Sequence, residues 1–420
     1  MAFEIVVPDW LDKQLIEQAL REEEKNNKIN VKMIKVWEVN SANDKYSSSL
    51  YRLTVEYHTH NDCDSPVSTK SIVVKAFPNT DHGEQIVIEN NTFTTETEVL
   101  ARIIPAFQRL LCDCSSERAV TFAPKCFYST GEPHSLVLQD LRQVGFKIAQ
   151  GTSGLDLDHS MLAVSRIGMF HAASVALHRQ DPKSFDNFLF YPSLDDKDAT
   201  RELLKYSFDA VADNVKSRPE VGPKYSEMLR HFGESAFQLL EEVVQRDEEG
   251  FNVLNHGDFW INHVMFRYDG SGAVSDIKFV DFQNCYYGSP VIDLQYFLYS
   301  SPSPEVRSDH TDRLLEWYHS SLSETLARLG CGDLCPSFED IRLEMDKRSF
   351  MGLITAVCVM PVVFSSADGT SDDVAQVPEE PEDHSETDCS SCHIPEKYTD
   401  EIMRLLPTFE IKCPVSKANV

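Results

Sequence analysis

The sequence predicts an α+β protein with a strand-rich N-terminal part and a mainly helical C-terminal part. Three runs near the N-terminus, 31–39, 50–57 and 71–77, alternate apolar with polar residues and are rich in β-branched side chains, as is typical of strands. From residue 158 onward, apolar residues recur at intervals of three and four, which is typical of helices that cover a core. Strands followed by helices indicate two differently built regions.

The helices are expected on both sides of the strand-rich runs. An amphipathic segment at 8–25 precedes the first strand, and its polar face is acidic, so it is expected to pack on the sheet. Proline within the first turn is well tolerated, so Pro290 is expected to open a helix. The remaining helices are expected at 158–177, 198–215, 221–247, 304–330, 336–364 and 396–406.

Composition divides the chain into four parts. Residues 1–140 hold the N-terminal helix and the strands, and residues 141–364 hold most of the helices. Between residues 365 and 391 there are nine acidic residues, two prolines and no lysine or arginine. Such a stretch cannot form a packed core, so 365–395 is expected to be a disordered acidic insert. Residues 396–420 would then be a C-terminal helix and tail.

Charge and composition exclude some classes of partner. Hydrophobic residues make up 42% of the chain and charged residues 25%, as in ordinary globular proteins. The formal net charge of −28 disfavours binding to a nucleic-acid backbone or to an anionic membrane. A small anionic ligand remains compatible with this charge, because a few local cations and a metal ion decide its binding. No feature of the sequence indicates an obligate protein partner.

The sequence also predicts a cytoplasmic protein. The N-terminus has no basic segment followed by a continuous apolar run, so no secretory signal is visible. No apolar run approaches the ~20 residues that span a bilayer. The chain has eleven cysteines, an odd number, and they lie mostly within apolar stretches. Reduced thiols in the cytosol explain this pattern most simply.

Two groups of polar residues lie close together between residues 254 and 300. The first is the string HGD, which ends at Asp258, and the second is the string DFQ, which begins at Asp281 after an apolar run. A turn at 269–272 separates two apolar runs between them, which predicts a β-hairpin. Such a hairpin would let both carboxylates face one cavity. Two carboxylates beside amide or imidazole donors suit a divalent cation and phosphate groups.

These strings resemble the signature of small-molecule kinases with a protein-kinase-like fold, such as aminoglycoside and choline kinases. The longer strings HGDFWINHVMF and VDFQNCYYGSPVIDLQYFL are similar, more narrowly, to the ecdysteroid kinase-like family, also called CHK kinase-like. The resemblance extends over roughly residues 1–365, and the central block is its most specific part. It implies a two-lobed fold: an antiparallel-sheet N-lobe that binds the nucleotide, and a mainly helical C-lobe with the catalytic and metal-binding loops.

The resemblance implies a role for each matching residue. Asp258 would be the catalytic base, and Asp281 would be the main ligand of Mg²⁺ bound with ATP. Lys75 lies in an apolar strand, where an unpaired ammonium would be costly, so it needs a partner. In the family this lysine reaches the phosphates and pairs with a glutamate of the next helix. Glu96 matches the F-x-x-E pattern, and Glu98 is the competing choice.

Two further segments would contact the nucleotide. The turn at 40–49 would lie over the phosphates, but it contains no glycine, so Ser47 and Ser48 would donate hydrogen bonds instead. An ordinary hairpin loop is an equally good interpretation of this turn. The string LQDL resembles the family's hinge segment, in which backbone groups near Gln139 and Leu141 would hold the adenine.

One residue departs from the family pattern. The family normally has asparagine five residues after the catalytic aspartate, as a second metal ligand, and here that position is His263. His263 could ligate the metal through an imidazole nitrogen, which suits Mn²⁺ better than Mg²⁺. Alternatively, Asn262 could reach the metal after a local backbone shift, or the second metal position could be lost. Asp293 resembles an aspartate that supports the catalytic loop, so a structural role is expected for it.

The sequence therefore predicts an ATP-dependent small-molecule kinase that transfers the γ-phosphate to a hydroxyl group. The resemblance makes an ecdysteroid or related sterol the leading acceptor, and choline-like or xenobiotic alcohols the alternative. A nucleotide-binding pseudokinase is a second hypothesis, because the turn lacks glycine and His263 replaces asparagine. Without the resemblance, a metal-dependent hydrolase would also fit His256, Asp258, His263 and Asp281, but it would not need Lys75 or its glutamate.

Overall fold

The structure, a computed structural model, divides into two compact units. The described residues are 7–38, 48–60, 66–76, 92–113, 120–131, 134–149, 154–190, 197–367 and 394–413. Unit 1 comprises Met1–Pro105, Thr121–Lys147 and Lys278–Gln283, and unit 2 comprises Ala106–Val120, Ile148–Ile277 and Asn284–Val420. Ser47 and residues 368–393 of the predicted acidic insert lie outside the described residues.

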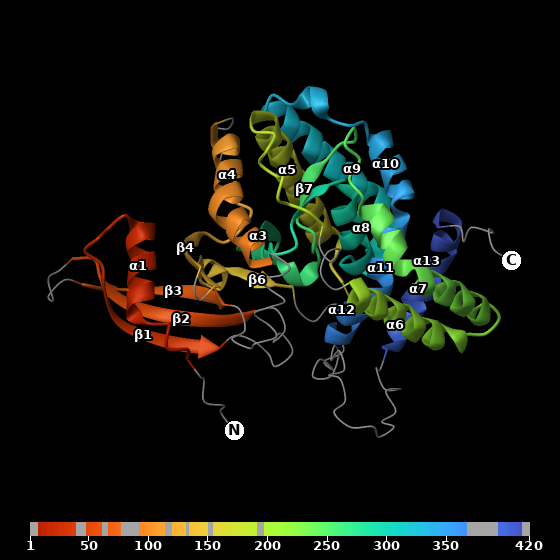
Figure 1. Cartoon of the computed structure of the whole chain (residues 1–420), viewed down its shortest axis with the longest axis horizontal. Coiled ribbons are helices and arrows are strands. Elements are labelled where there is room, and N and C mark those ends of the chain that lie inside the picture. The colour runs from red at the N-terminus through yellow and green to blue at the C-terminus, as the bar shows by residue number, and fades with distance from the viewer. Residues whose placement is uncertain are drawn as a thin grey trace, which may run out of the picture. The chain divides into compact units, whose positions relative to one another are not determined.

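Unit 1 is built on a five-stranded sheet of order β1-β2-β3-β5-β4 in which every neighbouring pair is antiparallel. Its strands are β1 (Asn30–Glu38), β2 (Ser49–His58), β3 (Val67–Ala76), β4 (Cys126–Gly131) and β5 (His134–Gln139). The three predicted N-terminal strands are therefore confirmed, and β3 is longer than expected because its polar first half pairs with β2. Figure 1 shows these strands in red to yellow.

One face of this sheet is covered by α1 (Lys13–Glu24). Along β2, residues Leu53, Val55 and their alternate neighbours are buried, and they form one core with Ile16 and Leu20 of the helix. Each such side chain contributes roughly 1.5–3 kcal/mol when it is fully buried. The helix begins later than predicted, because Asp12 caps it by accepting a hydrogen bond from the backbone N–H of Leu15.

Unit 2 is mainly helical. Its helices include α5 (Leu157–Gln180), α6 (Lys197–Lys216), α7 (Gly222–Val244), α8 (Val291–Ser300), α9 (Pro304–Arg328), α10 (Phe338–Lys347), α11 (Ser349–Cys358), α12 (Met360–Ala367) and α13 (Glu396–Lys412). A large apolar core joins α6, α7, α11 and α13. An antiparallel sheet in the N-terminal region and helices in the C-terminal region confirm the predicted fold class.

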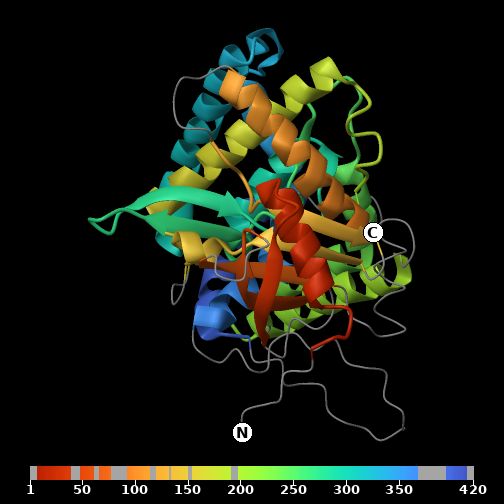
Figure 2. The ribbon, with the colours of Figure 1, turned by 90° about the vertical axis from the view of Figure 1, so that its left-hand side faces the viewer.

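The remaining strands, helices and turns are short. Two strands, β7 (Val253–Asn255) and β10 (Tyr286–Gly288), pair antiparallel in unit 2. The predicted hairpin is present as β8 (Val264–Tyr268) and β9 (Val274–Phe279), which Figure 2 shows as a twisted ribbon. The other short elements are β6 (Phe146–Ile148), α3 (Thr92–Glu98), the π-helical turn η1 (Val99–Ile103), α4 (Ile104–Asp113) and the 3₁₀ turns η2 (Leu141–Val144), η3 (Ile261–His263) and η4 (Gly332–Leu334).

The predicted helix boundaries near the C-terminus were wrong in three places. The single helix expected at 336–364 is three helices, since Arg348 ends α10 and Pro361 lies in the first turn of α12. Ser365 is buried within α12, so the helix continues into the segment expected to be disordered. The last helix runs to Lys412 despite Pro407, because burial of Phe409 continues its apolar face.

By length and composition, α5 is apolar enough to cross a membrane, and so is the bent pair of α10 with the following helices 349–365. However, 67% of the apolar window of α5 is buried inside the structure. Burial of that extent is typical of the core helix of a globular protein. In this protein α5 packs against α9, and its side chains help to support the loop that contains Asp258.

Candidate active site

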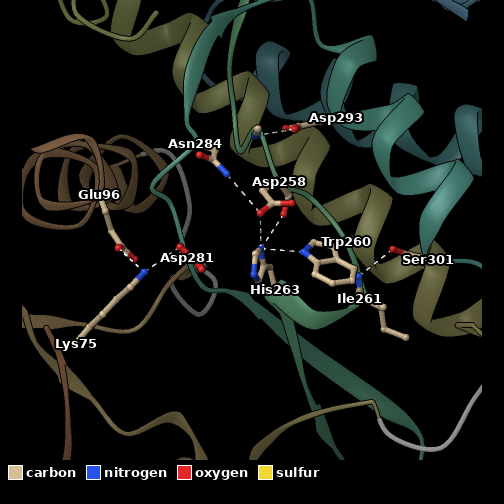
Figure 3. Close-up of polar contacts among 11 residues, drawn as sticks. Lys75, Glu96, Asp258, Trp260, Ile261, His263, Asp281, Asn284, Asp293 and Ser301 are labelled. Carbon is tan, nitrogen blue, oxygen red and sulfur yellow. Dashed lines mark hydrogen bonds and ion pairs between the residues drawn. The ribbon is translucent and has the colours of Figure 1, made fainter. Parts of the chain in front are cut away.

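In unit 1, Lys75 lies between two carboxylates. The side chain projects from β3 and is almost fully buried, and its Nζ lies 2.6 Å from Oε2 of Glu96 and 2.8 Å from Oδ1 of Asp281. Glu96 comes from α3 and is buried, and Asp281 follows β9 (Figure 3). The sequence predicted one partner for Lys75, and the structure shows two carboxylates paired with it.

The charges of this group explain its protonation. Burial by itself would lower the pKa of Lys75, but the carboxylates of Asp281 and Glu96 outweigh burial and raise the pKa well above its ordinary value of 10.5. Lys75 therefore stays charged. Removing one partner of a buried ion pair typically costs 3–5 kcal/mol, because the other charge is left without compensation.

The structure decides between the two candidate glutamates. Glu96 binds Lys75, whereas Glu98 pairs with Arg102, one helical turn further along the chain. Two residues separated by two positions lie on different sides of a helix, so both could not face the same lysine. The prediction that chose Glu96 agrees with this geometry.

Asp281 has an unusual backbone conformation. Its φ of 67° is in the left-handed region, which residues other than glycine rarely adopt. Strain of this kind persists only where the surroundings fix the backbone, and it concentrates at functional sites. Here the ion pair with Lys75 is one of the contacts that fix the side chain.

In unit 2, the loop that contains Asp258 is held at its first end by Asp293. This buried carboxylate on α8 accepts hydrogen bonds from the backbone N–H groups of His256, at 2.7 Å, and of Gly257, at 2.9 Å. Gly257 has a φ of 80°, and a Cβ atom there would lie 1.9 Å from the carbonyl oxygen of Asn284. Only glycine fits this position. The structural role predicted for Asp293 is confirmed by these contacts.

Asp293 is itself held by a buried chain of hydrogen bonds. Nε2 of His171, on α5, lies 3.1 Å from Oδ2 of Asp293, and Nδ1 of the same ring lies 3.0 Å from the hydroxyl of Tyr318 on α9. His171 is therefore a buried, hydrogen-bonded residue of the core. Side chains of helices α5 and α9 thus hold Asp293 in place, and Asp293 in turn holds the loop that contains Asp258.

The far end of the loop is held by α8 as well. The hydroxyl of Ser301, the C-cap of that helix, accepts a hydrogen bond of 2.9 Å from the backbone N–H of Ile261. Between the two ends, Phe259 is fully buried and stacks on Phe297 with ring centroids 4.8 Å apart. One helix therefore anchors the loop at three points. Figure 3 shows Asp293 above Asp258 and Ser301 to its right.

The carboxylate of Asp258 has three neighbours within its unit. Nδ2 of Asn284 and Nδ1 of His263 each lie 3.4 Å from Oδ2 of Asp258. The third is Tyr296, on α8: burial raises the pKa of this tyrosine well above its ordinary value, and the negative charge of Asp258 and a hydrogen bond to it raise it further. Sequence reasoning did not single out Asn284, although it lies directly after the DFQ string.

His263 turns back into its own loop. Its Nδ1 lies 3.0 Å from the backbone carbonyl oxygen of Asp258, and the indole N–H of Trp260 points to the same nitrogen at 3.1 Å. Asn262, the alternative metal ligand, lies beside it in η3 and is half-buried. The role of either residue as a metal ligand stays a prediction.

The residues predicted to hold the nucleotide base and phosphates are partly described. Ser48 is buried and directly precedes β2. The backbone N–H of Gln139 donates to the carbonyl of Lys125 at 2.9 Å, so this donor is already used within the sheet. Leu141 begins η2, two residues after the end of β5. The adenine contact predicted near this segment therefore depends on other backbone groups, including those of Leu141.

Sequence reasoning missed the part that Asp140 plays in this segment. Its buried carboxylate accepts a hydrogen bond of 2.6 Å from Ser71 Oγ and lies 3.0 Å from Nε of Arg52. It also accepts a hydrogen bond from the backbone N–H of Arg142. The predicted hinge is thereby fixed to β2 and β3, and the only signal in the sequence was an acidic residue at a strand end.

Among the described residues, no group of three or more His, Cys, Asp or Glu side chains is assembled as a metal site. The donor set does suit Mg²⁺, which typically takes one or two carboxylates and completes its shell with substrate phosphates and water. Asp281 offers such a carboxylate, with its side chain 22% exposed. The prediction that Asp258 and Asp281 face one cavity stays a prediction, since the two residues belong to different units.

The comparison with protein families identifies the class of protein. The model of the ecdysteroid kinase-like family matches residues 42–331, well over half of the chain. The chain therefore belongs to the ecdysteroid kinase-like family, as its central motifs suggested. This membership supports a small-molecule kinase.

Two further comparisons were made. The search of curated proteins found no match. Among solved structures, the chain is similar to "Amicoumacin kinase hAmiN in complex with AMP-PNP, Ca2+ and Ami". That similarity has a TM-score of 0.36 and 10% sequence identity, and it covers 97% of this chain and 96% of that chain.

Proposed function

We propose that this protein is an ATP-dependent kinase that transfers the γ-phosphate of ATP to a hydroxyl group of a small molecule. The observation that carries the proposal is the buried group of Lys75, Glu96 and Asp281. A lysine held by a helix glutamate beside an aspartate is the arrangement that phosphoryl transfer uses to bind phosphates and a metal. A structural ion pair would not require a third charge that is partly exposed.

In this proposal Lys75 changes partners when the nucleotide binds. Its ammonium would move toward the phosphates and release the carboxylate of Asp281, while Glu96 continues to hold the side chain. Asp281 would then hold Mg²⁺, or Mn²⁺, which supplies neutralising charge to the phosphates. The buried lysine thus compensates the carboxylate of Asp281 until the metal replaces it.

Asp258 would orient the acceptor hydroxyl and take its proton. The carboxylate lies in a loop that α8 anchors at both ends, so its position is set before the substrate binds. A base held in position typically contributes 10²–10⁴-fold to the rate. Asp258 would lose the hydrogen bond of Asn284 or of Tyr296 in accepting the substrate hydroxyl.

Family membership favours an ecdysteroid or a related sterol as the acceptor, in the cytoplasm. Choline-like and xenobiotic alcohols are the alternative acceptors. A nucleotide-binding pseudokinase is the second candidate function, and the observation that favours it is His263 at the position where the family pattern has asparagine. Turnover separates the two candidates, because a pseudokinase would bind ATP without consuming it.

The experiment that tests the proposal is a thermal-shift titration of the purified protein with ATP, separately with Mg²⁺, with Mn²⁺ and without metal. We expect a metal-dependent rise in Tm, because a ligand that binds only the folded state stabilises it by about 2.7 kcal/mol at 100 times its Kd. An Asp312→Ala variant, altered at an exposed position, serves as the control and should behave like the wild type. A flat Tm under every condition would refute the nucleotide site.

A phosphoryl-transfer assay follows, with sterols and amino alcohols as acceptors and ADP release as the readout. We expect ADP release that depends on the acceptor. Nucleotide binding without any ADP release would instead support the pseudokinase.

A further inference from the structure

In unit 1, an arginine shares a face of the sheet with Lys75. Arg52 on β2 is paired directly with Val73 on β3, and Leu50 is paired directly with Lys75. Residues that are paired directly, or that are two positions apart in one strand, point to the same face of a sheet. Arg52 therefore lies on the face that carries Lys75, whereas the alternate residues of both strands lie in the core with α1.

The side chain of Arg52 reaches across β3. Its Nε lies 3.0 Å from Oδ2 of Asp140, which directly follows β5, and β3 lies between β2 and β5 in the sheet. Neighbouring strands are roughly 4.8 Å apart, so the two side chains together bridge a distance on the order of 10 Å. Because Arg52 starts opposite Val73 and Asp140 also binds Ser71, the guanidinium group lies over this part of β3.

Asp140 holds one edge of the guanidinium and leaves the rest of it available. Oδ2 of this buried carboxylate also accepts a hydrogen bond of 2.6 Å from Ser71 Oγ, and Oδ1 accepts one of 3.0 Å from the backbone N–H of Arg142. A guanidinium carries five N–H donors in one plane, more than a carboxylate shared with two other donors can bind. The side chain of Arg52 is 25% exposed, so a ligand can reach it.

The proposed nucleotide would pass beside this guanidinium. In the proposed function Lys75 binds the phosphates, and backbone groups near Leu141 hold the base. Lys75 and Ser71 are four residues apart on β3, roughly 13 Å, and Ser71 is hydrogen-bonded to Asp140, the residue before Leu141. A nucleotide that contacts both Lys75 and Leu141 therefore lies along the face of β3 that Arg52 crosses.

From this placement we propose that Arg52 stacks on the base of the bound nucleotide and makes the site prefer purine to pyrimidine nucleotides. The inference rests on the proposed function, in which Lys75 and the segment 139–141 bind ATP. A planar guanidinium stacks on aromatic rings, and a cation over such a ring is attracted to it most strongly where water is excluded. The two fused rings of a purine offer this plane more area than the single ring of a pyrimidine.

The experiment compares three ligands by calorimetry on the full chain with Mn²⁺. Two are non-hydrolysable analogues of ATP and of CTP, and the third is inorganic tripolyphosphate, which has no base. In Arg52→Leu we expect the Kd of the ATP analogue to rise about tenfold and that of the CTP analogue about threefold. The Kd of tripolyphosphate should stay within about twofold of the wild type, because Lys75 still binds the phosphates.

Lys70→Leu is the matched control. Lys70 lies on β3 of the same sheet, its side chain is also 25% exposed, and it pairs with a carboxylate, Glu24. Since Glu24 belongs to α1, this ion pair lies on the opposite face of the sheet from Arg52. All three ligands should bind Lys70→Leu within about twofold of the wild type.

Arg52→Lys provides a second variant in case Arg52→Leu does not fold, which thermal melting would show. It keeps the charge but not the planar group, and we expect the Kd of the ATP analogue to rise at least about threefold with tripolyphosphate unchanged. A parallel loss of both ligands in Arg52→Leu would overturn the inference, and so would unchanged binding of the ATP analogue or a wild type that binds both analogues equally. A wild type that binds neither the ATP analogue nor tripolyphosphate would refute the proposed function itself.

Discussion

The candidate residues of unit 1 and those of unit 2 are each held by a different kind of interaction. In unit 1, Lys75 is bound by side chains that are 21 and 206 positions away in sequence, and charge is the main force. In unit 2, Asp258 lies in a loop whose backbone N–H groups are bound by Asp293 and Ser301, and hydrogen-bond geometry is the main force. We therefore expect a change of charge to disrupt the Lys75 group of unit 1. We expect a change of backbone shape to disrupt the Asp258 loop of unit 2.

The largest expected effect comes from removing the proposed base in unit 2 without changing the shape of its side chain. Asp258→Asn keeps the size of the side chain but cannot accept a proton. We expect kcat to fall by roughly 10³-fold, with the KM for ATP unchanged, because general-base catalysis contributes on this scale. Steady-state measurement of ADP release would show it, and full activity would remove Asp258 from the mechanism.

In unit 1, a substitution of Asp281 should weaken the binding of the metal and ATP rather than lower kcat. In Asp281→Ala, the metal-dependent rise in Tm on adding ATP should disappear, a loss of about 2.7 kcal/mol at an ATP concentration 100 times the wild-type Kd. Thermal shift with Mg²⁺ or Mn²⁺ measures it, and Asp312→Ala is again the control. A normal shift would show that Asp281 does not hold the metal.

Backbone shape can be tested at Gly257. Gly257→Ala places a Cβ atom 1.9 Å from the carbonyl of Asn284 on a backbone with a φ of 80°, so we expect at least about 2 kcal/mol of destabilisation. Denaturant unfolding measures the change. Gly270→Ala, in the turn of the β8–β9 hairpin, has no atom within 4 Å of the new Cβ and should change the stability by less than about 0.5 kcal/mol. Equal effects at both positions would contradict the close approach of Gly257 to the carbonyl of Asn284.

The matched pair Glu96→Gln and Glu98→Gln sharpens the charge side of the comparison. Glu96 is buried against Lys75; because the substitution keeps a side-chain oxygen there and Lys75 retains Asp281, we expect it to cost about 1–3 kcal/mol, less than the loss of a sole partner. Glu98 pairs with an exposed Arg102 on its own helix, and pairs of that kind contribute only about 0.3–0.5 kcal/mol. Reversed magnitudes in denaturant unfolding would show that the wrong glutamate had been assigned.

The smallest expected effect is that of pH on Lys75. The pKa of this lysine is raised in the folded state, so its contribution is fully present below its ordinary pKa of 10.5 and is lost as the pH rises through the higher folded value. The difference in the free energy of unfolding between the wild type and Lys75→Met should therefore be constant from about pH 7 to pH 9. A difference that shrinks in that interval would show that Lys75 is not held by both carboxylates.

Much of the fold could be predicted from periodicity. Alternation identified β1, β2 and β3, and the intervals of three and four residues identified α5, α6, α7 and α9, because burial on one face leaves a regular pattern in the sequence. The short strands β7 and β10 were not predicted, because three residues are too few to show a period. The break at Arg348 was also missed, because apolar residues continue on both sides of it.

The sequence identified most residues of the candidate site, but few of the contacts between them. The motifs identified Asp258, Asp281 and Lys75, and the need to compensate a buried ammonium demanded a carboxylate near Lys75. Sequence could not show that this lysine binds two carboxylates at once, because the second lies 206 positions away. It left three explanations open for His263, and it could not show that Nδ1 of this ring contacts Asp258 and Trp260.

The sequence by itself determined which residues carry charge and which segments form strands and helices, because both depend on local composition and spacing. It also showed a glycine, Gly257, within the HGD string, but it could not show why that position requires glycine. Only the tertiary structure decided that this glycine faces the carbonyl of Asn284, that Asp293 binds two N–H groups of the loop, and that Glu96 rather than Glu98 binds Lys75. Each of these depends on atoms from distant segments meeting within about 3 Å, and hydrogen bonds and ion pairs weaken steeply beyond that distance.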